Sequence, residues 1–506
     1  MEERFLESVR KSFPAAGATL TLGAPLLGGE CHPEPLVTVP LSMMNRHGLI
    51  AGATGTGKTK TLQLLAEQLS AAGVPVFLAD VKSDLSGIGV AGESGERVTQ
   101  RAHDTGFAWK PQTFPLELLS LSGKRGAQLR ATVSSFGPLL LAKVLGLNET
   151  QTSVLGLVFK YCDDKQLPLL DFADLRAVLN HLTGDGAADL EDYGGMSKAS
   201  VGVLLREMVE LEQQGAGAFF GEPEFDLDDL IQTERDGRGL ISALELSDVQ
   251  DRPALWSTFT MWLLARLYHE LPEVGDIEKP KLVFFFDEAH LLFRGASTAF
   301  LEQVEQVVRL VRSKGVGVFF VTQSPKDVPA AILGQLGHRV QHALRAFTAD
   351  DDTALRAAAR TFPKTEFYDL EETMTTLGIG EALVTVLGAN GVPTPPVATR
   401  LVPPASRMGP LTDAEMQQRL SASKQVQEYA QAIDRESARE RLAARMTTQP
   451  DHEPAARAPA RRGKAEPEST FEQVLKSPLT RSLANTVTRG LLGALLGSPP
   501  RRRRSY

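Results

Sequence analysis

Apolar and polar positions divide the chain into two regions in which short apolar strands alternate with amphipathic helices. The first region covers about residues 36–110 and contains apolar runs at 48–52 and 74–80. The second covers about residues 238–395, with apolar runs at 239–246, 281–287, 316–323, 338–344 and 381–393. Near-continuous apolar strands that alternate with helices are typical of a parallel sheet covered on both faces. We therefore expect an α/β core with a mainly parallel sheet.

The segments outside this core have a different pattern. Residues 111–237 show helical spacing and few strand signals, which predicts a helical insertion. Residues 396–448 combine a Pro-rich linker with a long polar helix, expected to begin at a capping box of Thr412 and Glu415 and to end near Met446. These features predict a C-terminal helical extension after the core.

The two ends of the chain have distinct compositions. Residues 1–35 form an N-terminal segment before the core, and residues 449–470 have the composition of a disordered linker. In residues 471–506 an apolar residue recurs at every fourth position, before four consecutive arginines. This predicts an amphipathic helix and a basic tail, which we expect to dock on a partner or mediate oligomerisation. Contact with a membrane or nucleic acid is the alternative.

The run GATGTGKT is the first candidate functional motif, because it fits the phosphate-binding loop G-x-x-x-x-G-K-[ST]. Glycines in such a loop let backbone N–H groups point at a phosphate, and the helix that follows directs its positive end there. Lys58 can reach the β- and γ-phosphates, and the Thr59 hydroxyl suits Mg²⁺. The predicted nucleotide-binding residues are Gly52, Ala53, Thr54, Gly55, Thr56, Gly57, Lys58, Thr59 and Lys60. We therefore expect ATP and Mg²⁺ as cofactors.

The run KLVFFFDEAH adds two acids at the carboxyl end of an apolar strand. Paired acids there are costly unless a metal or a reaction uses them. Asp287 is expected to bind Mg²⁺ through water, and Glu288 to polarise the attacking water. Gln323 ends the next strand and can sense the γ-phosphate. This layout is typical of ATPases with an added strand between the phosphate-loop strand and the acid strand, so we expect an ATP hydrolase.

Charge and composition narrow the class of protein. The net charge is −8 and the pI about 5.7, which argues against a surface generally coated for nucleic acid. Nucleic-acid contact must then come from local basic loops or from the basic tail. Two cysteines are too few for a disulfide framework or a zinc module. No apolar run is long enough to span a membrane and no secretory signal is evident, so we expect a cytoplasmic protein without an integral membrane segment.

Five runs in order, GATGTGKT, LADVKSDLSG, FFFDEAH, RLVRSKGVGVFFVTQSP and LGHRVQHALRAFT, resemble the HerA/FtsK superfamily of P-loop ATPases. Within it they are similar to the HerA-like, YjgR-type bacterial branch, over most of residues 30–400. The resemblance implies a RecA-like core, a hexameric ring and ATP hydrolysis coupled to translocation or helicase-like activity on double-stranded DNA. The chain departs from HerA in one respect, because only about 50 residues precede the phosphate loop. These are too few for the N-terminal barrel with which HerA docks its nuclease, so we do not expect that partnership.

The resemblance also assigns roles. It implies Lys58 and Thr59 at phosphate and metal, Asp287 at the metal, Glu288 as catalytic base and Gln323 as sensor. It further implies that Arg312 reaches the γ-phosphate bound by a neighbouring subunit, with Arg345 as the reserve for that role. From the residues alone, an arginine on an exposed helix such as Arg312 is usually a solvated charge.

A second class of function stays open. An ATP-driven protein-remodelling or regulatory ATPase that does not act on DNA fits the acidic surface, with protein partners at the helical insertion or the C-terminal helix. A two-lobed helicase is not expected, because LGHRVQHALR does not supply the Q-x-x-G-R-x-G-R stretch of its second lobe.

Overall fold

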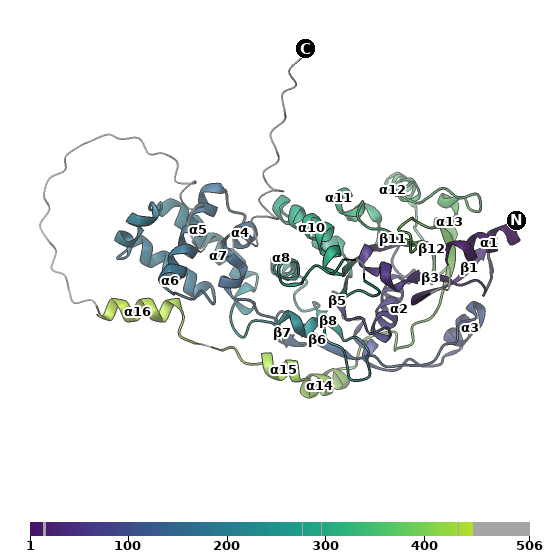
Figure 1. Cartoon of the computed structure of the whole chain (residues 1–506), viewed down its shortest axis with the longest axis horizontal. Helices are drawn as coiled ribbons and strands as arrows, with labels where there is room; N and C mark the ends of the chain where they lie inside the picture. The colour runs from purple at the N-terminus through teal and green to yellow at the C-terminus, as the bar shows by residue number, and fades with distance from the viewer. Residues whose placement is uncertain (14–16, 276, 295, 434, 449–506) are drawn as a thin grey trace, which may run out of the picture.

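A long twisted sheet runs through the body of the molecule (Figure 1). The computed structural model describes residues 1–448 except 14–16, 276, 295 and 434. The predictions for 449–470 and 471–506 lie outside the described residues. The strands are β1 (Thr19–Leu27), β2 (Glu30–Cys31), β3 (Val37–Pro40), β4 (Gly48–Ala51), β5 (Val76–Asp80), β6 (Leu116–Ser120), β7 (Ala127–Gln128), β8 (Ile241–Glu245), β9 (Leu282–Phe286), β10 (Val316–Thr322), β11 (His338–His342), β12 (Glu381–Thr385) and β13 (Val397–Leu401).

Strand order places the predicted functional segments side by side. The order is β2-β1-β13-β12-β11-β4-β10-β9-β5-β8-β6-β7, with β3 paired to β1. From β11 to β7 every pairing is parallel, and the pairings of β12, β13, β1, β2 and β3 are antiparallel. The predicted α/β fold is confirmed. So is the added strand, because β10 lies between β4 and β9.

Helices cover both faces of the parallel part. The α-helices are α1 (Glu2–Ser12), α2 (Lys58–Ala71), α3 (Glu96–Thr105), α4 (Val133–Val144), α5 (Glu149–Asp164), α6 (Phe172–Thr183), α7 (Lys198–Gln213), α8 (Pro253–Glu270), α9 (His290–Phe293), α10 (Thr298–Val311), α11 (Ala330–Leu333), α12 (Ala349–Ala359), α13 (Leu370–Thr376), α14 (Asp413–Ala422), α15 (Lys424–Tyr429) and α16 (Ala438–Thr448). The 3₁₀ helices are η1 (Leu41–Arg46), η2 (Ser86–Gly89), η3 (Ala187–Tyr193), η4 (Ala216–Ala218), η5 (Leu227–Leu230), η6 (Arg312–Lys314) and η7 (Pro325–Asp327).

Alternation along one strand explains why a hydrophobic core forms on each face of the sheet. On β9, Phe284 and Phe286 join the core shared with α8 and α10, whereas Val283 and Phe285 join the core shared with α1 and α2. All four side chains are buried. A strand that is apolar at every position thus fills both faces of the sheet, as expected for a buried parallel strand.

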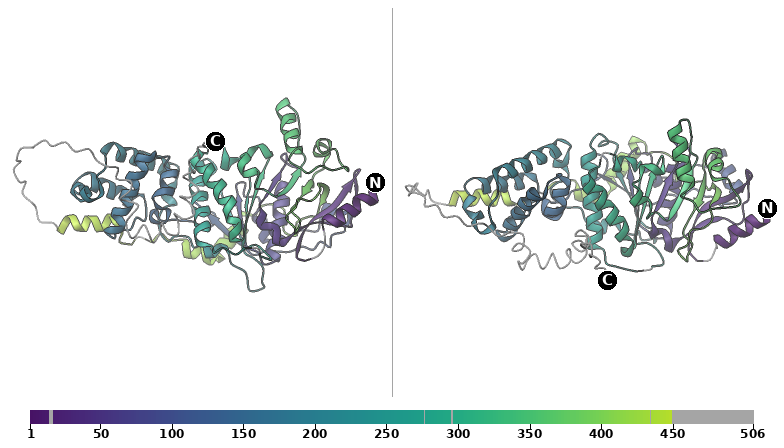
Figure 2. Two further views of the ribbon diagram at one scale, coloured as in Figure 1. Left: turned by 45° about the horizontal axis from the view of Figure 1, so that its top comes forward. Right: turned by 90° about the horizontal axis from the view of Figure 1, so that it is seen from above.

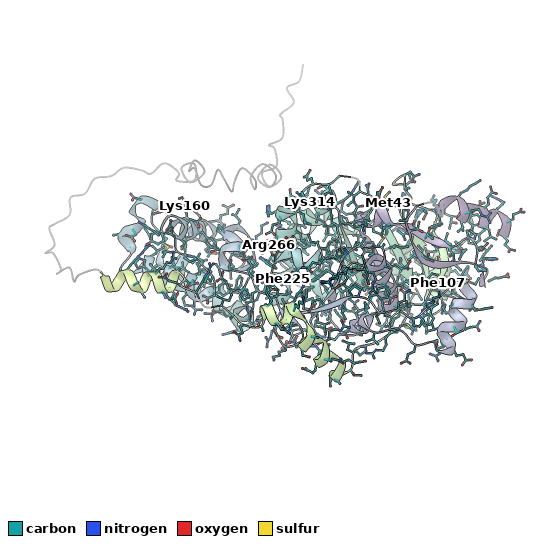
Figure 3. The ribbon with its side chains drawn as sticks, turned by 60° about the horizontal axis from the view of Figure 1, so that its bottom comes forward. Met43, Phe107, Lys160, Phe225, Arg266 and Lys314 are labelled. Atoms are coloured by element: carbon teal, nitrogen blue, oxygen red, sulfur yellow. The ribbon has the colours of Figure 1, made fainter. Side chains whose placement is uncertain are left out.

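The insertion forms a helical bundle of α4 to α7 at one end of the elongated molecule (Figure 2). It begins later than the predicted 111–237 range, because β6 and β7 within that range belong to the sheet. Arg266, which is labelled in Figure 3, lies on α8 at the junction with the bundle. It donates to Glu224 at 2.6 Å and stacks on Trp262.

The C-terminal extension runs back along the sheet and reaches the bundle (Figure 1). The capping box of Thr412 and Glu415 is confirmed at the start of α14. The single long helix expected to follow it is wrong, since the structure has α14, α15 and α16 instead. Ser423 is extended and its side chain accepts the N–H of Val426, which ends one helix and starts the next. α16 then packs on α6.

No helix in the described part of the chain has the length and apolar character needed to cross a membrane.

Candidate functional site

The phosphate loop lies between β4 and α2, at the edge where the parallel strands end. Its backbone is anchored from three sides: Gly52 N–H donates to Thr322, Ala53 N–H to Ala343, and Gly380 N–H to Thr56 at 2.9 Å. Gly57 caps α2 in a left-handed conformation with φ of 114°. A side chain at that position is strained, so glycine is required where the loop becomes helix.

The loop has the features of a phosphate cradle. Gly55 has φ of 79°, and a Cβ placed there would meet nothing within 4 Å, so the space over the loop is open. The first turn of α2, with Lys58, Thr59 and Lys60, offers N–H groups that have no partner inside the helix. Such a helix start is suited to bind an anion. The loop therefore fits the phosphates of a nucleotide.

The lysines of the loop differ in their surroundings. Lys58 is buried and donates to the Ala53 carbonyl at 3.1 Å. Burial lowers its pKa, against the opposing charges of Glu288 and Asp287. Lys60 is half-buried and donates to Gln63 at 3.4 Å. Of the two, Lys58 is the ammonium that the loop itself encloses.

Asp287 follows β9 and is buried, with 3% of its surface exposed. Its Oδ2 has no hydrogen-bond partner among the described residues. Burial, and next the charge of Glu288, raise the pKa of Asp287 to about 7. A buried carboxylate oxygen without a partner lacks the positive charge or donor that would stabilise it.

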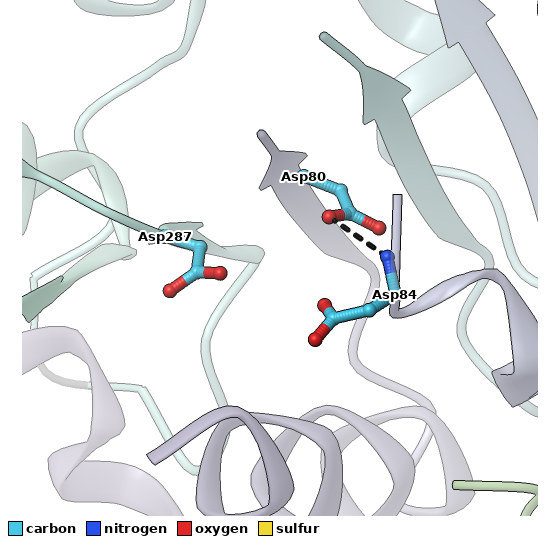
Figure 4. A group of neighbouring side chains, drawn as sticks. All are labelled: Asp80, Asp84 and Asp287. Atoms are coloured by element: carbon cyan, nitrogen blue, oxygen red, sulfur yellow. Dashed lines mark hydrogen bonds between the residues drawn. The ribbon is translucent and has the colours of Figure 1, made fainter. Parts of the chain in front are cut away.

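Two further acids lie beside Asp287, and sequence reasoning assigned them no role. Carboxylate oxygens of Asp80, Asp84 and Asp287 lie within 4.8 Å of one another (Figure 4). Carboxylates are ligands that Mg²⁺ prefers, so this set fits a hydrated magnesium ion. The signal was present in VFLAD, an apolar strand that ends in an acid as LVFFFD does. What it did not show is that β5 pairs with β9.

Asp80 organises the loop after β5. It is fully buried and accepts the N–H groups of Lys82 at 3.2 Å, Asp84 at 3.3 Å and Leu85 at 2.9 Å. Burial, and then Glu245, raise its pKa to about 8. Three backbone donors on one carboxylate hold this loop in a defined conformation.

Glu288 directly follows Asp287 and has an unusual backbone. Its φ is +47° and it is buried, with 4% exposed. Its Oε1 accepts a hydrogen bond from Lys82, and its Oε2 has no hydrogen-bond partner among the described residues. Burial favours the neutral form of Glu288, but the hydrogen bond and charge of Lys82 outweigh it and hold the pKa below its ordinary value. Glu288 is therefore a charged carboxylate with Oε1 hydrogen-bonded to Lys82 and Oε2 buried 3.1 Å from His290 Nδ1.

A cavity of about 330 Å³ adjoins the phosphate loop. It is lined by Ala53 and Thr54 of the loop, by Gln323 after β10, and by Arg345 after β11. The structure thus brings Gln323 and Arg345 to the loop of the same chain. Gln323 and Arg345 line the same cavity as Ala53 and Thr54.

Arg312 lies elsewhere. It is exposed in η6, just before the first residue of β10, whereas the phosphate loop and Gln323 lie at the carboxyl end of that sheet. A seven-residue strand spans about 20 Å, so Arg312 and its own phosphate loop lie at opposite ends of the parallel strands. Arg312 is therefore not part of the site formed by its own phosphate loop.

Comparison with known proteins agrees with this architecture. The chain is similar to the bacterial conjugative coupling protein TrwB in its unbound form, with a TM-score of 0.50 and 14% identity over 78% of this chain and 91% of that chain. It is equally similar to plasmid coupling protein TrwB in complex with ADP and Mg²⁺, with a TM-score of 0.50 and 16% identity over 79% of this chain and 100% of that chain.

VirB4 of Thermoanaerobacter pseudethanolicus is also similar, with a TM-score of 0.47 and 13% identity over 80% of this chain and 100% of that chain. No curated protein matches the chain in sequence. The model of one family, described as helicase HerA-like C-terminal, matches residues 27–504. The chain belongs to this HerA-like family, and it is a P-loop ATPase with a RecA-like core.

Proposed function

We propose that this protein is a ring-forming ATPase that couples ATP hydrolysis to movement along double-stranded DNA. The observation that carries the proposal is the joint placement of a phosphate loop, a buried acid pair and a sensor strand at one edge of the sheet. Membership of the HerA-like family supports the link to DNA, and TrwB, similar in fold, is named a conjugative coupling protein.

Each predicted residue then has a place in the reaction. Backbone N–H groups at the start of α2 and the Lys58 ammonium hold the phosphates. Thr59 and Asp287, with Asp84 and Asp80 behind them, hold Mg²⁺, which neutralises charge on the phosphates when bound. Glu288 accepts a hydrogen bond from the attacking water through Oε2 and aligns it with the γ-phosphate.

Two further residues complete the site. Gln323, exposed beside the phosphate loop, donates to the γ-phosphate or to the water. Arg312 reaches the γ-phosphate bound by the next subunit of a hexamer, because its own phosphate loop lies at the far edge of the sheet. Arg345, which lines the cavity beside its own phosphate loop, is the alternative if Arg312 has no such role.

ATPase assays on the full chain, with and without double-stranded DNA, test the proposal. DNA is expected to stimulate hydrolysis several-fold, and the stimulation should fall between about 50 and 200 mM salt because phosphate contacts release counterions. Glu288→Gln, the matched control, is expected to bind ATP and to hydrolyse it only at a small residual rate. Light scattering with ATP on that variant reports whether a hexamer forms.

An ATPase that remodels or regulates proteins is the second candidate. Two observations favour it: the net charge of −8, and a helical bundle that stands at one end of the molecule and is held by α16. In that case hydrolysis is unchanged by DNA at every salt concentration, and removal of the bundle contact alters binding to a protein partner instead. Hydrolysis without any DNA response supports this candidate over the first.

A further inference from the structure

The loop between β5 and η2 presents one lysine to the acid pair. Lys82 donates a hydrogen bond to Glu288 Oε1 and forms an ion pair with it, across 206 positions of sequence. Its side chain is 47% exposed, whereas that of Glu288 is 5% exposed. The contact therefore joins a partly open ammonium to an enclosed carboxylate.

The lysine is held in place by its own loop. Asp80 accepts the Lys82 N–H, and the next residue, Ser83, has a left-handed φ of +56° and donates its hydroxyl to Ser247 at 2.8 Å. Gln250 donates to the carbonyl of Val81. Because the backbone is hydrogen-bonded on both sides of Lys82, the position from which its side chain extends is fixed.

Glu288 depends on such a partner. Its left-handed φ of +47° is uncommon for a residue with a Cβ and needs support from its surroundings. Oε1 is occupied by Lys82, and Oε2 is buried without a hydrogen-bond partner in the described chain. His290 Nδ1 lies 3.1 Å from Oε2 but is also without a hydrogen bond there. The two carboxylate oxygens thus differ in what they can accept.

We propose that Lys82 is a positioning residue for ATP hydrolysis: it anchors Glu288 through Oε1 so that Oε2 faces the attacking water. The inference rests on the proposed role of Glu288 as the base. Lys58 and the loop N–H groups hold the phosphates without help from Lys82. Loss of Lys82 should therefore reduce kcat and leave ATP affinity nearly unchanged.

Kinetics of the full chain test this. Lys82→Ala is expected to lower kcat by about 10- to 100-fold, the cost typical of a misplaced catalytic group, with Kd for ATP within about threefold of wild type. Lys82→Arg keeps a cationic donor and should recover part of kcat. Lys11→Ala, which removes a lysine–glutamate ion pair to Glu7 on α1, is the matched control and should change neither quantity. Thermal unfolding without nucleotide checks that each variant is folded.

A double-mutant cycle separates positioning from a general structural effect. If Lys82 acts through Glu288, then Lys82→Ala should cause no further loss of rate in a Glu288→Gln background. Equal losses in both backgrounds, or an unchanged or increased kcat for Lys82→Ala alone, overturn the inference. Failure of the proposed function looks different: the wild-type chain then does not hydrolyse ATP, or Glu288→Gln hydrolyses it at the wild-type rate.

Discussion

The ammonium of Lys58 donates to the carbonyl oxygen of Ala53, five residues earlier in the same loop, at 3.1 Å. The contact closes the phosphate loop on itself and keeps a buried cation hydrogen-bonded. When phosphate enters the loop, the same ammonium must turn from a neutral carbonyl to an anion. The exchange favours binding because hydrogen bonds between charged groups are stronger than those to neutral acceptors.

Lys58→Ala is accordingly expected to abolish tight ATP binding, since no other ammonium is enclosed by the loop. Fluorescent-nucleotide titration measures the change. Without nucleotide, the unfolding temperature should stay close to wild type, because Ala53 keeps its backbone N–H bond to Ala343. Binding at wild-type affinity in a folded variant contradicts the assignment.

Asp287→Asn is expected to raise stability while it abolishes hydrolysis. In the protein without metal, Asp287 is buried next to Glu288 and near Asp84, so removal of its charge relieves repulsion and desolvation. A gain of about 1 kcal/mol, or about 2 °C in unfolding temperature for a chain of this size, is expected without Mg²⁺.

Glu288→Gln provides the contrast for that measurement. The charge of Glu288 is already matched by Lys82, so this variant should not be stabilised. Scanning calorimetry with and without Mg²⁺ compares the two variants. An Asp287→Asn protein that is less stable than wild type without metal shows that the buried carboxylate is not under electrostatic strain.

Arg312→Ala is expected to bind ATP normally and to hydrolyse it about 10³- to 10⁵-fold more slowly, the range known for an arginine supplied in trans. Mixing it with Lys58→Ala should restore activity. A subunit with an intact phosphate loop can then receive Arg312 from a Lys58→Ala neighbour.

The readout is ATPase rate against mixing ratio, after exchange of subunits has been demonstrated. Each mutant alone lacks one part of every site, and unlike neighbours complete one. A rate that stays at the single-mutant level in confirmed mixed rings removes the role from Arg312 and directs the same experiment to Arg345.

Acid should destabilise the protein through its buried histidines. Burial lowers the pKa of His47 and of His338 to about 4. The unfolded chain takes up these protons near pH 6.5, so it binds more protons than the folded chain between about pH 6.5 and 4. Stability is complete above pH 6.5 and declines as pH falls through this window, by on the order of 3 kcal/mol for each ring.

His47→Asn isolates one ring in that profile. His47 has φ of +58° and accepts the Val318 N–H through Nδ1. Asparagine tolerates this backbone and offers an oxygen to the same donor. Urea unfolding from pH 7 to 4.5 should show a shallower decline for the variant. Parallel curves for variant and wild type show that His47 does not titrate in this window. Asp80, whose pKa is raised to about 8, opposes the trend equally in both proteins.

Features that depend on local chemistry could be predicted from the order of the residues alone. The phosphate loop is recognisable because phosphate binding needs glycines, a lysine and a threonine at fixed spacing within one short loop. The strand ending in Asp287 and Glu288 is recognisable because an apolar run with terminal acids has few other uses. The parallel sheet followed from strands that are apolar on both faces. In contrast, the residue roles remain predictions to be tested by the experiments above.

Which segments lie next to one another became known only from the folded chain. Strand order placed β5 beside β9, and so brought Asp80 and Asp84 to Asp287 and Lys82 to Glu288. No local pattern encodes that pairing, because each strand buries equally well against several neighbours. The same order put β11, and with it Arg345, beside the phosphate loop, whereas Arg312 precedes β10 and lies at the opposite end of that strand. Local spacing predicts an element, but the packing of whole layers determines which side chains share a site.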